Sequence, residues 1–134
     1  MEEIISYLIA ICRTAKGIHY RALGDKFYSD HLLCDRICDG LDDFVDEIFE
    51  IYYLGKAEEA PQQKEIMESV ADILPKIDDD INRDFYFLDT LIINCLASLE
   101  VLSEKEGTVG DSDLIGRIGS DLQKKHGFIG RRLK

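Results

Sequence analysis

Hydrophobic residues recur along this chain at three- and four-residue steps, the spacing of amphipathic helices. The first such stretch covers about residues 2–23, and Gly24 follows it as a helix stop. Its apolar positions are Ile4, Ile5, Leu8, Ile11, Cys12 and Ala15. A second stretch begins near residue 25 or 29 and continues to residue 54, before Gly55. Its apolar stripe consists of Leu33, Ile37, Leu41, Phe44, Ile48 and Ile51. The pattern predicts two long helices joined by a short turn.

The second half of the chain repeats this organisation after a longer, polar connection. Residues 56–75 contain both prolines, and the amphipathic segment 65–74 within them predicts a short helix. A third long helix is expected over about 75–106, with the stripe Ile77, Ile81, Phe85, Leu88, Leu91, Ile92, Cys95 and Leu99. A fourth is expected over about 111–133, with Leu114, Ile118, Leu122 and Ile129 on one face. The sequence therefore predicts an all-α fold, a four-helix bundle with one long crossover, which is a topology that includes the ferritin-like folds.

Length and composition fit one domain spanning residues 1–134, because 46% of the 134 residues are hydrophobic and supply a core. The net charge of -11 disfavours a general nucleic-acid or anionic-membrane binder, since both partners need a basic surface. No uninterrupted apolar run approaches the roughly 18 to 20 residues of a membrane span. The first residues lack the basic region of a signal peptide. We therefore expect a cytoplasmic protein without a membrane partner.

The four cysteines, Cys12, Cys34, Cys38 and Cys95, each lie in an apolar helical pattern, and the sequence contains no CxxC motif. Buried free thiols in a reducing cytoplasm are the interpretation that this placement favours. Oxidation by peroxide, or a role as extra metal ligands, is the alternative that the sequence leaves open for the first three.

A histidine and several acids share one face of the second predicted helix. At about 100° per residue, four candidate ligands fall within a sector of about 100°: His31, Asp35, Asp46 and Glu50. The first two are four residues apart, as are the last two, so each pair can share a metal ion. The pairs are separated by eleven residues, or about 16 Å along the helix axis, whereas metal–ligand bonds measure only about 2 to 2.5 Å.

A second copy of this helix, packed antiparallel across a twofold axis, removes the difficulty. It places Asp46 and Glu50 of one subunit opposite His31 and Asp35 of the other, and two equivalent sites result. His19, at the end of the first predicted helix, is placed to complete each site. The alternative that spacing alone leaves open is an acidic face exposed to solvent.

The surrounding residues match a longer motif. A histidine and an aromatic residue are followed by a glycine, a phenylalanine, a second histidine and three acids, namely His19, Tyr20, Gly24, Phe27, His31, Asp35, Asp46 and Glu50. In its residue types and in every interval, this stretch of about 32 residues resembles the signature of the Dps family of ferritin-like mini-ferritins. The resemblance extends more weakly over the rest of the chain, including Gly110–Asp111 and the helix that follows.

The resemblance implies that His19, His31, Asp35, Asp46 and Glu50 are the ligands and catalytic residues of a di-iron ferroxidase site shared between two subunits. Such a site oxidises Fe(II), usually with hydrogen peroxide, and the ferric mineral is stored inside a hollow shell of twelve subunits. The implied roles are iron storage and protection from oxidative stress. Histidine and carboxylate ligands suit iron, and zinc is an alternative occupant of the same ligand set. The sequence does not decide between peroxide and dioxygen as the oxidant.

The chain departs from the family at two features. Many members have tryptophan after the first histidine and again late in the last helix, where this chain has Tyr20 and Gly127. Members that coat DNA often carry a lysine-rich N-terminal arm, whereas this chain starts with Met1-Glu2-Glu3 and is basic only at residues 131–134. We therefore expect weak DNA binding or none. A DNA-compacting Dps-like protein with little ferroxidase activity is the alternative function.

Two other classes of protein fit less well. Classical ferritins and bacterioferritins enclose the di-iron site within one bundle by Glu-x-x-His motifs, and this sequence contains no such motif. A plain helical interaction module requires the ligand spacing to be a coincidence.

Overall fold

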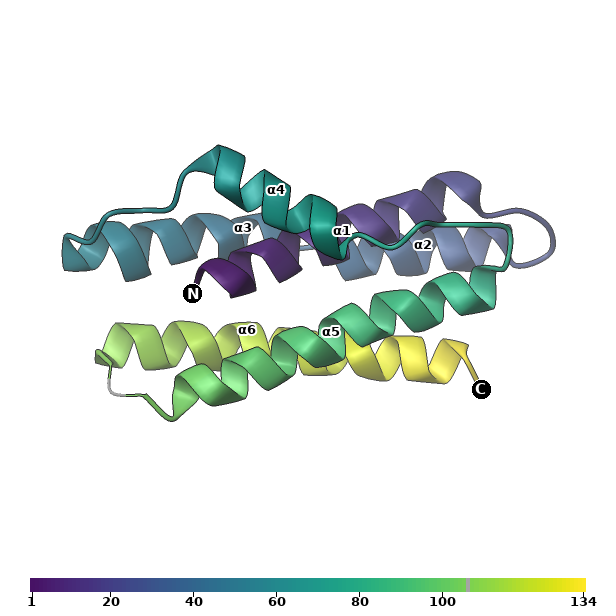
Figure 1. Ribbon diagram of the computed structural model, residues 1–134. Helices are drawn as coiled ribbons and strands as arrows, with labels where there is room; N and C mark the ends of the chain where they lie inside the picture. The colour runs from purple at the N-terminus through teal and green to yellow at the C-terminus, as the bar shows by residue number, and fades with distance from the viewer. Residues whose placement is uncertain (106) are drawn as a thin grey trace.

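The computed structural model describes residues 1–105 and 107–134, which are helical along most of their length (Figure 1). The α-helices are α1 (Glu2–Arg21), α2 (Phe27–Cys38), α3 (Leu41–Glu47), α4 (Gln63–Ile73), α5 (Ile81–Ser103) and α6 (Val109–Arg132). A π-helical segment, η1 (Ile48–Tyr53), and a 3-10 turn, η2 (Leu54–Lys56), follow α3 directly. The described residues contain no β-strand, and the predicted all-α class is confirmed.

The helices form two antiparallel hairpins, one made by α1 with α2 and α3, the other by α5 with α6 (Figure 1). The connection between the hairpins runs along the length of the molecule and includes α4, which packs on α1. This helix confirms the short helix predicted in the long connection. Helix α1 contacts α2, α3, α4 and α5, so it lies at the centre of the packing.

The core contains most of the apolar stripes that the sequence predicts. The fully buried positions include Ile4, Ile5, Leu8 and Ile11 of α1, Ile37, Leu41 and Ile48 of the following segments, and Phe85, Leu88, Ile92, Leu114, Ile118, Leu122 and Ile129 of the second hairpin. Their burial stabilises the packing of the two hairpins by about 1.5–3 kcal/mol for each large side chain removed from water.

The second predicted helix is not continuous. It ends at Cys38 and restarts at Leu41, because Gly40 adopts a left-handed conformation with φ of +80°. The buried ammonium group of Lys125, on α6, donates a hydrogen bond of 2.5 Å to the backbone carbonyl of Asp39. That contact satisfies an acceptor that the interrupted helix leaves without its usual partner. Helix α3 nevertheless continues in the direction of α2 (Figure 1), so the two still form one side of their hairpin.

The limits of the last two long helices also differ from the prediction, because capping side chains define them. Helix α5 begins at Ile81 rather than at residue 75, since the Asp80 carboxylate accepts a hydrogen bond from the backbone N–H of Arg83 at 3.2 Å. Helix α6 begins two residues before the predicted start, where Thr108 and Asp111 form a reciprocal capping box.

Helix α5 is long and apolar enough to cross a membrane by length and composition, with a mean hydropathy of 1.6 in its most apolar window. Arg83 and Asp84 lie in its first turn, and Asp89 lies within its apolar stretch. The face that carries Phe85 and Leu88 is buried within the protein core, and core helices of soluble proteins often meet the same two criteria.

Candidate metal centre

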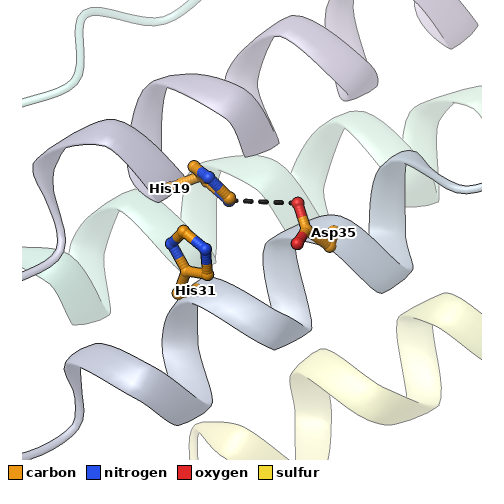
Figure 2. Close-up of side chains that lie close together, drawn as sticks. All are labelled: His19, His31 and Asp35. Atoms are coloured by element: carbon orange, nitrogen blue, oxygen red, sulfur yellow. Dashed lines mark ion pairs between the residues drawn. The ribbon is translucent and has the colours of Figure 1, made fainter.

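Three side chains that the motif identifies as ligands meet between α1 and α2. His19 lies in the last turns of α1, and His31 and Asp35 lie one turn apart on α2. The short connection around Gly24, which has a φ of +80°, reverses the chain and brings the two helices together in antiparallel orientation. One ligand atom from each of the three residues lies within 4.8 Å of the others (Figure 2).

The geometry of this cluster leaves donor atoms available. The Nδ1 atom of His19 lies 3.1 Å from the Asp35 carboxylate, which is about half exposed. The imidazole rings of His19 and His31 face each other, with centroids 3.6 Å apart and an angle of 32° between the rings. Within the described part of the chain, the buried Nδ1 atom of His31 has no hydrogen-bond partner. Buried polar atoms normally have one, so a bound cation coordinated there would supply the missing interaction.

The other two candidate ligands lie elsewhere. Asp46 is on α3 and Glu50 is on η1, and both side chains are exposed. They do not belong to the cluster of metal-binding groups that the described residues form. The chain therefore brings three of the five predicted ligands together and leaves two separate, as the helical spacing predicts for a single subunit.

Aromatic and aliphatic side chains surround the cluster. The ring of Tyr20 meets that of His19 edge-on at 5.3 Å, and the ring of Phe27 lies 5.3 Å from that of His31. Both residues are exposed, as are Leu23, Tyr28 and Leu32 nearby in the sequence. Several exposed apolar side chains therefore lie close to the cluster in the sequence, and exposed apolar side chains that gather on a surface commonly mark an interaction site.

An open groove of about 610 Å³ begins at Asp35 and extends past the break between α2 and α3. Cys12 and Lys16 of α1 line one side, and Cys38 and Gly40 lie opposite them. The sequence interpretation treated the cysteines singly and missed that two of them meet in this groove. The signal was present, because Cys12 is seven residues before His19 and Cys38 is seven residues after His31. Seven residues are about two helical turns, so an antiparallel pair of helices that joins the histidines also joins these cysteines.

Two other side chains that could bind a ligand, His126 and Arg132, take part in interactions within the chain. His126, to which the sequence interpretation gave no site role, lies 2.6 Å from Asp89 through its Nδ1 atom. Arg132, in the basic C-terminal segment, donates hydrogen bonds to the buried Asp30 carboxylate and to Asn82. This arginine therefore stabilises the contact of α6 with α2 and α5.

No family model, curated protein or solved structure matches this chain. The resemblance to the Dps family therefore rests on the residues of the motif and on their intervals.

Proposed function

We propose that this protein is a Dps-like mini-ferritin that oxidises Fe(II) at sites shared by two subunits and stores the ferric product. The observation that carries the proposal is the half-complete ligand set, in which His19, His31 and Asp35 meet while Asp46 and Glu50 remain exposed outside the cluster. Imidazole and carboxylate groups are suitable ligands for iron. Zinc fits the same ligands and would compete with iron for them.

The positions of the four ligands on α2, α3 and η1 support a twofold arrangement. His31 lies nine residues before Gly40 and Glu50 lies nine after Leu41, while Asp35 and Asp46 lie five residues on either side. Two copies packed antiparallel about the Gly40–Leu41 bond would therefore place each His31 opposite a Glu50. Each Asp35 would lie opposite an Asp46, and one isologous interface would create two identical sites.

The surface around this proposed axis suits a second copy of the chain. A Cβ atom added at Gly40 would meet no atom within 4 Å in the described chain, so a partner helix has space to approach closely. The exposed side chains of Tyr20, Phe27, Tyr28 and Leu32 supply apolar area beside the half-sites. The charged ligands at the interface would repel one another without a cation, so metal binding and association would be coupled.

The chemistry of the site requires two electrons for each peroxide. Two Fe(II) ions each supply one electron, the O–O bond of hydrogen peroxide breaks, and two protons complete two water molecules. The chain's own residues would bind and orient the iron substrate. His19 would hold the Asp35 carboxylate in place through its Nδ1 atom, and the acidic surface would attract the cations.

A ferritin-like four-helix bundle and a shell of twelve subunits complete the proposal. Two antiparallel hairpins with a long connection, and α4 within it, are compatible with that bundle topology. A hollow shell would provide the volume for mineral that a dimer lacks. Light scattering should therefore give a mass far above that of two 15.3 kDa chains, and a mass of one or two chains would contradict the shell.

Complementation between two variants tests the shared site. His31→Ala and Glu50→Ala should each abolish rapid Fe(II) oxidation, because every site then lacks one ligand. In a mixed dimer with one change in each subunit, one site lacks both ligands and the other keeps all of its own. Co-assembled variants should therefore recover up to half the parent rate for each mixed dimer.

The control is Asp72→Ala, which removes an exposed carboxylate on α4 outside the motif and should leave the oxidation rate unchanged. Rates should be followed under anaerobic loading with Fe(II) and then addition of peroxide, and mixing should be confirmed with differently tagged chains. No recovery despite confirmed mixing would exclude a site shared between subunits.

The alternative function, DNA compaction with little ferroxidase activity, loses one of the basic residues of the C-terminal segment. Arg132 is held by Asp30, and its side chain is only 12% exposed. A phosphate contact by this arginine would require the buried ion pair to break.

A further inference from the structure

We infer that Cys12 and Cys38 form a peroxide-reactive dithiol that closes to a disulfide between α1 and α2. This inference goes beyond the proposed iron chemistry, because it requires a hydroperoxide and the two thiols but no metal ion. It replaces, for these two residues, the interpretation that the cysteines serve only as core packing.

The first support is the contact between Cys38 and Cys12. The thiol of Cys38 donates a hydrogen bond of 3.3 Å to the backbone carbonyl of Cys12, across the interface of α1 and α2. The Sγ atom of one helix thus lies against the main chain of the other at the cysteine itself. The single hydrogen of the Cys38 thiol can instead turn to the neighbouring Cys12 sulfur, and that interaction lowers the pKa of Cys12. A disulfide, with an S–S bond of about 2.05 Å, would therefore join two helices at a point where they already touch.

The second support is access from solvent. Both cysteines line the open groove that begins at Asp35, and Cys38 is partly exposed. The remaining two cysteines, Cys34 and Cys95, are buried in the core. Hydrogen peroxide, which is hardly larger than water, can enter a groove of about 610 Å³. Cys12 is itself mostly buried, but it is 8% exposed and borders the groove, whereas Cys34 and Cys95 are 0% exposed.

The electrostatic environment favours Cys12 as the attacking group. The hydrogen bond from Cys38 lowers the pKa of Cys12 to about 7, although burial acts in the opposite direction. Lys16 and Arg13 on α1 lower this pKa further, and Asp42 on α3 raises it. The same hydrogen bond, with burial, raises the pKa of Cys38. One thiol is thus ready to ionise near neutral pH while its neighbour stays protonated.

The reaction takes two balanced steps. The Cys12 thiolate attacks one peroxide oxygen, an S–O bond forms, the O–O bond breaks, and hydroxide leaves and takes up a proton. The sulfur of Cys38 then loses its proton and attacks the oxidised Cys12 sulfur, so an S–S bond forms and a second hydroxide leaves as water. The two thiols lose two electrons, and one peroxide becomes two water molecules.

The relative rates of the cysteines can be estimated. Burial raises the pKa of Cys34 and of Cys95 to about 12, so very little thiolate exists at neutral pH. The thiolate of a thiol with a high pKa is intrinsically more nucleophilic, which reduces the difference in reaction rate but does not remove it. Cys12 should therefore react at least about a hundredfold faster with peroxide than Cys34 or Cys95.

Tryptic mapping of the full chain can test the inference, because cleavage places the four cysteines on separate peptides, 1–13, 27–36, 37–56 and 84–105. The protein is treated at neutral pH with a chelator and one equivalent of peroxide, so iron chemistry does not contribute. We expect the chain to become two hydrogens lighter and peptides 1–13 and 37–56 to be linked. Any other linkage, unchanged thiols, or reaction of Cys34 as fast as that of Cys12 would overturn the inference.

Variants distinguish the attacking thiol, Cys12, from the thiol that completes the disulfide, Cys38. Cys38→Ser should let Cys12 stop as a sulfenic acid that a cyclic 1,3-diketone traps, whereas Cys12→Ser should slow the loss of peroxide by at least about a hundredfold. The matched control is the double variant Cys34→Ser and Cys95→Ser, which should form the disulfide as the parent does. Circular dichroism tests whether each variant folds. If a variant does not fold, the peptide mapping of the parent protein alone decides whether the inference holds. Because the chelator is present throughout, failure of the ferroxidase assay would leave this result unaffected.

Discussion

Replacing Asp30 by alanine should destabilise the fold strongly, because it leaves Arg132 without its buried partner. The carboxylate is 1% exposed and the arginine side chain is 12% exposed. Arg132 donates two hydrogen bonds to Asp30, of 2.6 and 3.2 Å, and its guanidinium group lies 5.2 Å from the ring centre of Phe85. Loss of one partner of a buried ion pair costs about 3–5 kcal/mol. With an unfolding entropy of about 2.1 cal/mol/K per residue, the melting temperature should fall by about 10–18 °C.

The matched control is Asp79→Ala. Asp79 accepts a hydrogen bond from Arg21 at 2.8 Å, but the two side chains are 97% and 52% exposed, so their separation should change the stability by less than about 0.5 kcal/mol. Urea denaturation of both variants gives the comparison. Adding Arg132→Met to Asp30→Ala should recover part of the loss, because no unpaired charge then remains buried. Equal effects of Asp30→Ala and Asp79→Ala, or a double variant less stable than Asp30→Ala alone, would refute the reasoning.

Three further predictions follow from charge and from the groups already described. With a net charge of -11 per chain, the protein should not retain duplex DNA at about 200 mM salt in a mobility-shift assay, and a retained shift would contradict this. The Cys12–Cys38 disulfide joins residues 26 apart and should raise the free energy of unfolding by about 3.5 kcal/mol in the chain-entropy estimate. Calorimetry with and without reductant measures this difference, and no gain would indicate strain in the folded state. Burial raises the pKa of the Asp84 carboxyl, and a hydrogen bond from the backbone N–H of Asp78 partly offsets this effect. The folded protein therefore favours the protonated carboxyl. The free energy of unfolding should fall as the pH rises from the ordinary pKa of 3.8 through the higher pKa of the folded protein. Asp84→Asn should therefore be more stable than the parent at neutral pH, by a margin that disappears in acid.

The helices could be predicted from the sequence because their apolar positions keep one spacing over several turns. The short helix α4 is an example, since 65–74 was predicted and Gln63–Ile73 is observed. The break at Gly40 could not be predicted in the same way. An isolated glycine is tolerated within a helix, and the contact that stabilises this break comes from Lys125, which lies 86 residues away. Local patterns carry no information about such a distant partner.

The candidate site was predictable to a similar degree. The intervals between His19, His31 and Asp35 identified side chains that meet in the folded chain, because one short turn joins the two helices that carry them. The pairing of Cys12 with Cys38 follows from the same antiparallel packing but was not recognised, since their pairing depends on the register between α1 and α2. Asp46 and Glu50 lie outside the cluster in the single chain, and in the proposed dimer they would reach it only from the second subunit.

The proposed twofold axis at Gly40 can be tested by comparison with Gly24. Both glycines have a φ of +80°, and a Cβ atom at either would meet nothing within 4 Å in the described residues. Alanine at either position should therefore lower the free energy of unfolding by a similar amount, about 1–2 kcal/mol, because of backbone strain. Gly40 also lines the groove beside Asp35, where the partner subunit would pack. Gly40→Ala should thus place two additional methyl groups in the interface and weaken association by about tenfold or more, since overpacking costs about 1–3 kcal/mol. Gly24→Ala should weaken association less, because that residue lies sixteen positions from the axis in the sequence, beside the half-site rather than on the axis. Sedimentation over a dilution series measures association, and urea midpoints measure the shared loss of stability. If both variants associate as the parent does, the subunits do not meet at Gly40, and the shared iron site would need a different register.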